Sequence, residues 1–173
     1  TAIGVMAAAI QRLEDNQMRG AVKGTVKLMF EYLGPEMSIT RRIVFSNLWL
    51  FGWLVERKLA ALPEMNAAIR TTTAPVMVEG GTKENILPKK ARAVINFRIL
   101  PGDTVNKVVE HAQKTIDDSQ VKITVVENPW DPSVVSSLES ESFITVQKTI
   151  RQIFPKTVVA PYLVAGATDS RYY

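Results

Sequence analysis

The sequence lacks cysteine altogether and contains one histidine among its 173 residues. Disulfides and thiolate metal sites are therefore excluded, and the lack of cysteine mildly favours a reducing compartment without excluding export. His111 lies beside the apolar stripe of a predicted helix, where a structural or surface role is the ordinary interpretation. No H-x-D, H-E-x-x-H, G-x-S-x-G, P-loop or G-x-G-x-x-G pattern occurs. The sequence shows no catalytic centre, and we expect this chain to bind no zinc.

A long hydrophobic run and a concentrated charge are also missing. The most apolar stretch, IVFSNLWLFGWLV at residues 43–55, is interrupted by Ser46, Asn47 and Gly52 and is shorter than the roughly 20 residues that cross a bilayer. We expect no membrane span; a buried helix is the ordinary interpretation, with a subunit contact or an apolar pocket wall as alternatives. The basic residues, 21 against 17 acidic, are dispersed, so no nucleic-acid interface is expected.

What the sequence does contain is typical of a folded chain, with 46% hydrophobic and 22% charged residues. Apolar residues recur at helical spacing from residue 3 to 16, and Thr1 is a candidate N-cap. Residues 21–67 are predicted to be mostly helical.

From about residue 69 the period changes from 3.6 to 2. The segment 69–79 predicts a strand with an edge or bulge at Pro75. In the next strand, residues 91–99, odd-numbered positions are apolar and even-numbered ones mostly polar. The sequence PGDT then ends the strand, Thr104 can cap a helix, and residues 121–127 predict a third strand.

The order of helix, strand, strand, helix, strand predicts an α/β (α+β) fold, an open sandwich whose antiparallel sheet has helices on one face. One more strand before Thr1 would complete a ferredoxin-like βαββαβ unit. The Pro- and Ser-rich segment 128–137 predicts a domain boundary, giving domains at 1–128, with the helical insertion 21–67, and 129–173. The second domain is expected to hold a helix and a buried strand near 157–166.

Two polar residues flank the alternating strand. Asn85 precedes it and offers both a donor and an acceptor, while Arg98 ends it with a planar fork of donors suited to a carboxylate. On spacing alone, a loop-capping asparagine and a surface arginine are the ordinary interpretation. Along one extended strand the two residues lie up to about 40 Å apart.

A second polar group is the turn AGATDSRYY near the chain's end. Gly166 permits close backbone approach to a ligand, and Thr168, Asp169 and Arg171 follow the carboxyl end of a predicted strand, where open α/β sheets bind ligands. The alternative is a simple strand-to-helix turn.

These segments resemble a known family. ENILPKKARAVINFRILPGDT, residues 84–104, resembles the lid, or dimerisation, domain of the di-zinc aminoacylase and carboxypeptidase metallopeptidases, with its N-x-[IV]-P turn, arginine-ended strand and Pro-Gly step into a helix. VAPYLVAGATDSRYY, residues 159–173, resembles the G-x-T-D-x-R-[FY] turn of their catalytic domain. NAAIRTTTA and FSNLWLF are most similar to the carboxypeptidase S and N-fatty-acyl-amino-acid synthase/hydrolase branch.

The resemblance implies hydrolysis of a peptide or N-acyl-amino-acid amide bond next to a free carboxylate. Two zinc ions activate a bridging water and a glutamate is the general base. The family's metal ligands and Glu-Glu pair have no counterpart here, nor does its G-G-H-S segment. The chain is expected to be a lid plus a stub of the catalytic domain, inactive alone and with no catalytic residue of its own.

The resemblance also assigns residues. Asn85 and Arg98 match the lid's substrate-binding pair, and Gly166, Thr168 and Asp169 match a turn that lines the substrate site, with Arg171 matching less firmly. A homodimer through the lid is implied, whose two-fold axis brings Asn85 of one subunit toward Arg98 of the other. The alternative is a non-catalytic ferredoxin-like module for ligand binding or assembly.

Overall fold

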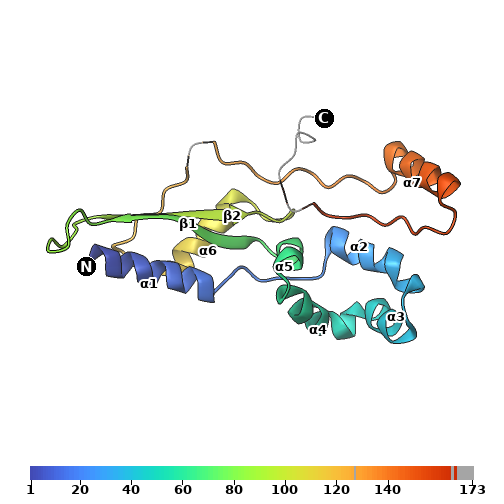
Figure 1. Ribbon diagram of the computed structural model, residues 1–173, viewed down its shortest axis with the longest axis horizontal. Helices are drawn as coiled ribbons and strands as arrows, with labels where there is room; N and C mark the ends of the chain where they lie inside the picture. The colour runs from blue at the N-terminus through green and yellow to red at the C-terminus, as the bar shows by residue number, and fades with distance from the viewer. Residues whose placement is uncertain (127, 165, 167–173) are drawn as a thin grey trace. The chain divides into compact units, whose positions relative to one another are not determined.

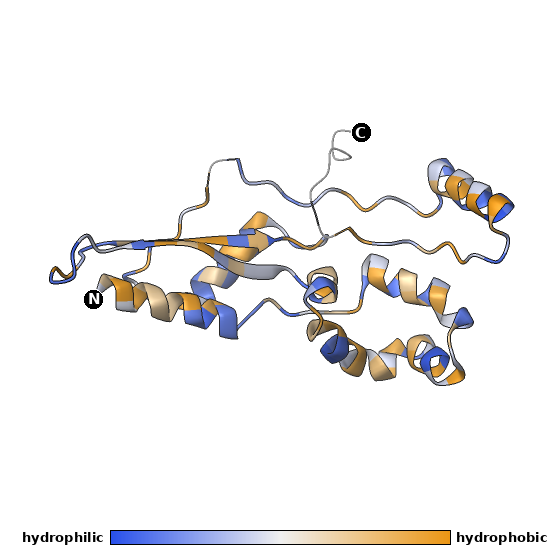
Figure 2. Ribbon diagram, viewed as in Figure 1, coloured by the Kyte–Doolittle hydropathy of each residue, from blue (hydrophilic) through white to orange (hydrophobic). Residues whose placement is uncertain are grey.

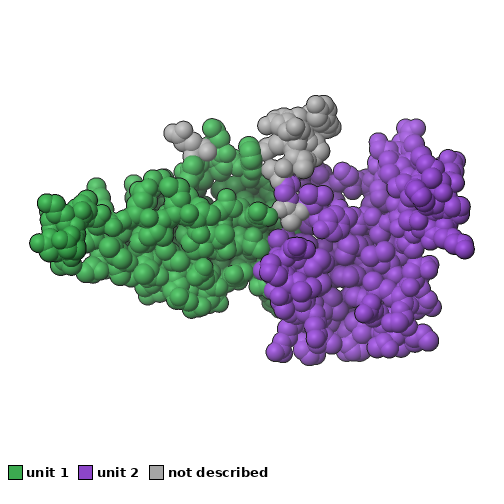
Figure 3. Space-filling model, viewed as in Figure 1, with its two compact units in different colours: residues 1–19, 70–132 green, residues 20–69, 133–173 purple. Residues whose placement is uncertain are grey.

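The computed structural model describes residues 1–126, 128–164 and 166. These form two compact units: residues 1–19 with 70–132, and residues 20–69 with 133–173 (Figure 3). Each unit therefore consists of two separate stretches of chain. The second stretch of the first unit is anchored at its end, because the backbone N–H of Val105 donates to Oδ1 of Asp131 at 2.7 Å.

The first unit contains two helices and a hairpin (Figure 1). Its elements are α1 (Ala2–Asp15), β1 (Thr72–Gly80), β2 (Ala91–Arg98) and α6 (Val105–Ile116). The two strands form an antiparallel sheet in which Thr72 pairs with Arg98 and Gly80 with Ala91. The register shifts between Pro75 and Met77, as expected for a proline that cannot donate to the ladder.

The core of this unit lies on one face of the hairpin. Ala9 and Leu13 of α1 pack against Ala112 and Ile116 of α6, and Ile95 of β2 packs on the same cluster. The guanidinium of Arg12 also donates to the carbonyl of Ile116, joining the ends of the two helices. The prediction of helices packed with an antiparallel sheet is therefore confirmed.

Both helices of this unit begin at predicted caps. The hydroxyl of Thr1 accepts from the N–H of Gly4 at 3.1 Å, and that of Thr104 accepts from Lys107 at 3.3 Å. Each threonine satisfies an N–H group that would otherwise lack a partner in the first helical turn.

The predicted third strand is not formed over residues 121–126. Val121 and Ile123 still turn toward the core, and Lys122 and Thr124 are exposed, so the period of two is present. A strand needs a neighbour to complete its hydrogen bonds, and this segment pairs with neither strand of the sheet. Among the described residues the sheet is therefore two-stranded, smaller than the sequence predicted.

The secondary structure described for the second unit is all helical, and hydrophobic and hydrophilic residues alternate along its helices (Figure 2). Its elements are α2 (Gly24–Leu33), η1 (Gly34–Glu36), α3 (Ile39–Ser46), α4 (Leu48–Ala60), α5 (Pro63–Ile69) and α7 (Glu141–Ile153). The core consists of Val26 and Phe30 from α2, Val55 from α4, and Ala68 and Ile69 from α5. The helical prediction for 21–67 is confirmed.

Two predictions for this unit were wrong. The apolar run 43–55 is not one buried helix: it breaks at Asn47, whose side chain donates to the carbonyl of Ile43 at 2.8 Å, and its tryptophans are exposed. Residues 157–164 form no strand, although Pro161 is buried, because no other strand is available to pair with them in this unit as described. None of the described helices is long and apolar enough to cross a bilayer.

A buried threonine fixes the end of the hairpin. Thr71 is fully buried; its hydroxyl donates to Oδ2 of Asp103 at 2.7 Å and accepts from the N–H of Leu100 at 3.0 Å. Leu100 and Asp103 belong to the turn that follows β2, and Lys107 donates to the carbonyl of Gly102 in the same turn at 2.8 Å. The start of β1 and the turn after β2 are thus held together by one side chain.

We predict that Thr71→Val lowers the free energy of unfolding by about 1–3 kcal/mol, because the N–H of Leu100 and the carboxylate of Asp103 would lose their partner. Thr73→Val is the matched control: the hydroxyl of Thr73 is buried with no hydrogen-bond partner among the described residues, so its removal should be neutral or stabilising. Urea unfolding of both variants tests this. Equal midpoints would contradict it.

Candidate functional site

Arg98 is the last residue of β2 and lies on the solvent face of the strand. The alternation positions it: Ile95 and Phe97 turn toward the helices, whereas Asn96 and Arg98 are exposed. The turn held by Thr71 begins two residues later, at Leu100. The guanidinium is thus carried by a backbone that is fixed on both sides, by the ladder to Thr72 and by the buried hydroxyl.

Asn85 lies in the loop that joins the two strands, between Gly80 and Ala91, and it is exposed. The loop turns through Gly81, which has a φ of 79°, a value that favours glycine. Ile86 and Leu87 next to Asn85 are also exposed, at 53% and 76%. The tip of the hairpin therefore presents an amide and two apolar side chains.

The antiparallel register separates these two residues. Arg98 pairs with Thr72 at one end of the sheet, whereas Asn85 follows the other end, where Gly80 pairs with Ala91 (Figure 1). From Ala91 to Arg98 alone, the strand spans about 23 Å. The structure does not bring Asn85 and Arg98 together within one hairpin.

The remaining predicted residues lie at the end of the second unit. Gly166 is exposed, and a Cβ at this position would meet no atom within 4 Å. Thr168, Asp169 and Arg171 lie outside the described residues. Their proposed contacts with substrate stay predictions.

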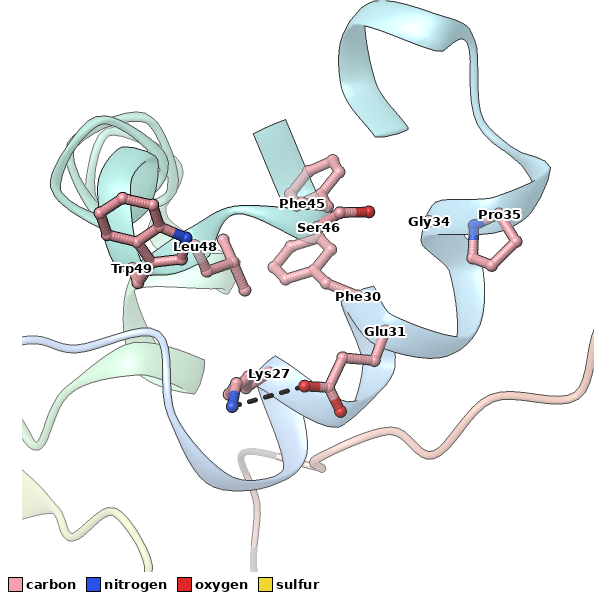
Figure 4. Close-up of a pocket in the computed structure, with 9 residues that line it drawn as sticks. All are labelled: Lys27, Phe30, Glu31, Gly34, Pro35, Phe45, Ser46, Leu48 and Trp49. Atoms are coloured by element: carbon pink, nitrogen blue, oxygen red, sulfur yellow. Dashed lines mark ion pairs between the residues drawn. The ribbon is translucent and has the colours of Figure 1, made fainter. Parts of the chain in front are cut away.

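A shallow cavity of about 290 Å³ lies in the second unit (Figure 4). The rings of Phe30 and Phe45 stack at its centre, 4.3 Å apart and inclined by 12°. An ion pair between Lys27 and Glu31, 3.4 Å long and half-exposed, lies beside it. Phe45 and Trp49 line this cavity, as the pocket-wall alternative for the apolar run predicts, and α2 supplies the opposite side.

The residues of the described chain do not fit a zinc site. No group of three histidine, cysteine, aspartate or glutamate side chains lies close enough to hold a metal ion anywhere in those ranges. His111 on α6 has its Nε2 atom buried with no hydrogen-bond partner in the described structure, and no carboxylate cluster accompanies it. No step of a metal-dependent reaction is assigned to this chain.

The fold and the side chains together define an α+β module that presents an arginine and an asparagine on a rigid hairpin, with a helical insertion beside it in sequence. Residues 1–124 match the model of the peptidase dimerisation domain of the M20 peptidases. The chain therefore belongs to the M20 peptidase dimerisation domain family. The family prediction made from the sequence is confirmed.

Several curated proteins are similar to the chain over its whole length. "Probable carboxypeptidase S-like 2" of Dictyostelium discoideum is 43% identical over 173 residues, which cover 100% of this chain and 33% of that protein. "N-fatty-acyl-amino acid synthase/hydrolase PM20D1" is 39% identical in Xenopus tropicalis and 37% identical in Homo sapiens, again over 100% of this chain and 34% and 35% of those proteins. The chain thus spans about a third of the length of these relatives. No solved structure matches it.

We predict that the dialysed 173-residue chain contains well under one zinc per molecule, because the described residues offer no cluster of ligands. Metal analysis by mass spectrometry after dialysis against buffer free of chelator and metal tests this. A tight site with one zinc per chain would contradict the prediction.

Proposed function

We propose that this chain is the lid and dimerisation part of a zinc-dependent hydrolase that cleaves a peptide or N-acyl-amino-acid amide bond next to a free carboxylate. In this proposal residues 1–128 are the lid, with the helical insertion, and residues 129–173 belong to the catalytic domain. The names of the relatives, a probable carboxypeptidase S-like protein and N-fatty-acyl-amino acid synthase/hydrolases, support the reaction class.

One observation carries the proposal, namely the position of Asn85 and Arg98 at opposite ends of the hairpin. Two residues of one binding pair that cannot meet within a protomer can meet across a two-fold axis, where one copy's loop faces the other copy's strand end. A two-fold contact creates two such sites at once, because each residue of the pair is supplied once by each subunit. The proposal that Asn85 and Arg98 bind one substrate together therefore requires the proposed dimer.

The surfaces available for the dimer are consistent with it. Among the residues that the structure describes, both outer edges of the β1–β2 sheet lack a neighbouring strand, and β1 exposes Val76, Met77 and Val78 by more than half. Unpaired edges invite pairing with another strand. We propose that the lid pairs edge to edge with its copy, with α1 packing against its twin.

The ferredoxin-like unit is part of the same proposal. A strand ahead of Thr1 would supply the hydrogen-bond partner that residues 121–126 need. The alternation of Val121 and Ile123 toward the core supports this, since the side chains already take the positions of a strand. The sheet would then have four strands instead of the two described.

In this proposal Arg98 and Asn85 recognise the substrate, and the group they recognise is the carboxylate next to the scissile bond. The guanidinium of Arg98 can bind a carboxylate through two parallel N–H donors, and the amide of Asn85 can donate to or accept from the substrate. Gly166, Thr168, Asp169 and Arg171 stay candidate substrate contacts by resemblance. The two zinc ions, their ligands and the general base are expected in other parts of a longer protein.

We predict that Arg98→Ala in the full-length enzyme lowers kcat/KM about 10- to 100-fold on substrates with a free carboxylate, because a charge-assisted pair worth about 1.5–3 kcal/mol is lost. Arg92→Ala is the matched control, since Arg92 is an exposed arginine on the same face of β2 that makes a 4.0 Å ion pair with Glu79. It should change kcat/KM less than about twofold. Wild-type activity that is equal on a carboxamide analogue would refute the assignment.

We further predict that full-length Asn85→Ala and Arg98→Ala enzymes, mixed and allowed to exchange subunits, recover activity. A mixed dimer has one intact site and one doubly damaged site, so an equal mixture should reach about a quarter of wild-type activity. Light scattering must first find the dimer; for the 173-residue chain this is a mass of about twice 19.2 kDa.

The control for this experiment mixes Asn85→Ala with the Asn85→Ala/Arg98→Ala double variant. No arrangement of those subunits contains an intact pair, so no recovery is expected. If the first mixture also stays inactive while its subunits exchange, both residues serve a site of one subunit and the shared pair is ruled out.

A further inference from the structure

Helix α4 carries apolar side chains on two sides. Leu48, Val55 and Leu59 pack in the core of the second unit. On another side Trp49 and Trp53 are 84% and 67% exposed. These two indoles are four residues apart, so they are neighbours on one face of the helix.

This second apolar side, which we call the tryptophan face, consists of Trp49, Leu50 and Trp53, with Arg57 one turn further on. Leu50 is 49% exposed, so the three apolar side chains are contiguous over a little more than one helical turn. Large apolar side chains that are exposed singly are common, but a contiguous group usually marks a contact with something outside the chain. The core of the second unit forms without the tryptophan face, because the buried stripe of α4 is separate from it.

The segment that carries this face has an excess of basic residues, and Glu31, which lines the cavity beside Trp49, is paired with Lys27. From residue 39 to 60 the sequence has four basic residues, Arg41, Arg42, Arg57 and Lys58, and one acidic residue, Glu56. Arg41, Arg42, Arg57 and Lys58 are all exposed. The preceding helix α3 adds exposed Ile39 and Ile43 to this basic segment, at 76% and 53%.

The combination of exposed tryptophans and nearby basic residues indicates whether a protein or a lipid surface covers this face. Protein–protein interfaces are enriched in tryptophan and arginine, but they are depleted in lysine and carry few charges at their buried centres. Helices that lie on a lipid surface combine tryptophan and leucine on one side with lysine and arginine beside them, because the indole prefers the boundary between headgroups and acyl chains. The tryptophan face has the second composition.

We propose that the tryptophan face of α4 docks the protein onto an anionic lipid surface, with Trp49, Leu50 and Trp53 entering the headgroup boundary and Arg57 and Lys58 contacting anionic headgroups. Helix α4 has 13 residues and would lie in the plane of the surface without crossing it. This docking goes beyond the proposed hydrolysis and does not depend on it. It would hold the protein where amphiphilic molecules collect.

The test is flotation of the full-length protein with vesicles of phosphatidylcholine alone or of phosphatidylcholine and phosphatidylserine in equal parts. Wild type should float with the anionic vesicles and much less with the neutral ones. Trp49→Ser/Trp53→Ser should weaken binding by about tenfold or more, because the apolar contact is removed. Trp130→Ser is the matched control, since Trp130 is 56% exposed but belongs to the first unit, and it should bind as wild type does.

A second variant tests the charges without touching the apolar face. Arg57→Gln/Lys58→Gln should weaken binding about fivefold for each charge removed and should reduce its dependence on salt. These side chains are exposed, so the variant should fold even where the tryptophan double variant does not.

Three results would overturn the proposal: no flotation of wild type with either vesicle, unchanged flotation of both variants, or equal loss in Trp130→Ser. Light scattering of Trp49→Ser/Trp53→Ser identifies the competing occupant. If that folded variant halves in mass relative to wild type, the tryptophan face covers a second copy of the chain, and the lipid proposal fails.

Discussion

The antiparallel register of β1 and β2 is the constraint on which the proposed site depends. Once Thr72 pairs with Arg98 and Gly80 with Ala91, the loop that holds Asn85 and the strand end that holds Arg98 must lie at opposite ends. Neither end can move along the other strand, since a shift of one residue would turn Ile95 out of the core. A pair formed from these residues therefore requires a second copy of the hairpin.

The two faces of β2 separate the residues of the core from the arginine proposed for recognition. The inward face carries Ile95 to the cluster of α1 and α6, where small residues such as Ala9 and Ala112 let the helices approach closely. The outward face keeps Arg92 and Arg98 exposed. Burial of one face fixes the direction of the other, so Arg98 is held in a defined position although it lies outside the core.

Helix α4, like β2, has one side in a core and another side exposed. Its buried stripe packs in the core of the second unit, and the tryptophan face lies outside that core. Over the whole sequence the basic residues are dispersed, which argues against a nucleic-acid interface. Residues 39–60 differ from this average because they are locally basic. The local excess of basic residues indicates a docking surface only because Trp49 and Trp53 are exposed next to it.

The sequence by itself determined the local features: the helical and alternating periods, the caps at Thr1 and Thr104, and the family, because each depends on residues close together in the chain or on a motif. The tertiary structure decided the features that depend on contacts with distant segments of the chain. Residues 121–124 alternate in burial, but residues 121–126 form no strand, since the hydrogen bonds of a strand come from a neighbour. Thr71 gave no signal in the sequence, because its partner Asp103 lies 32 residues away. The exposure of the tryptophans was likewise decided by packing: hydrophobicity gives a residue's tendency to be buried, and the available core surface determines which residues are.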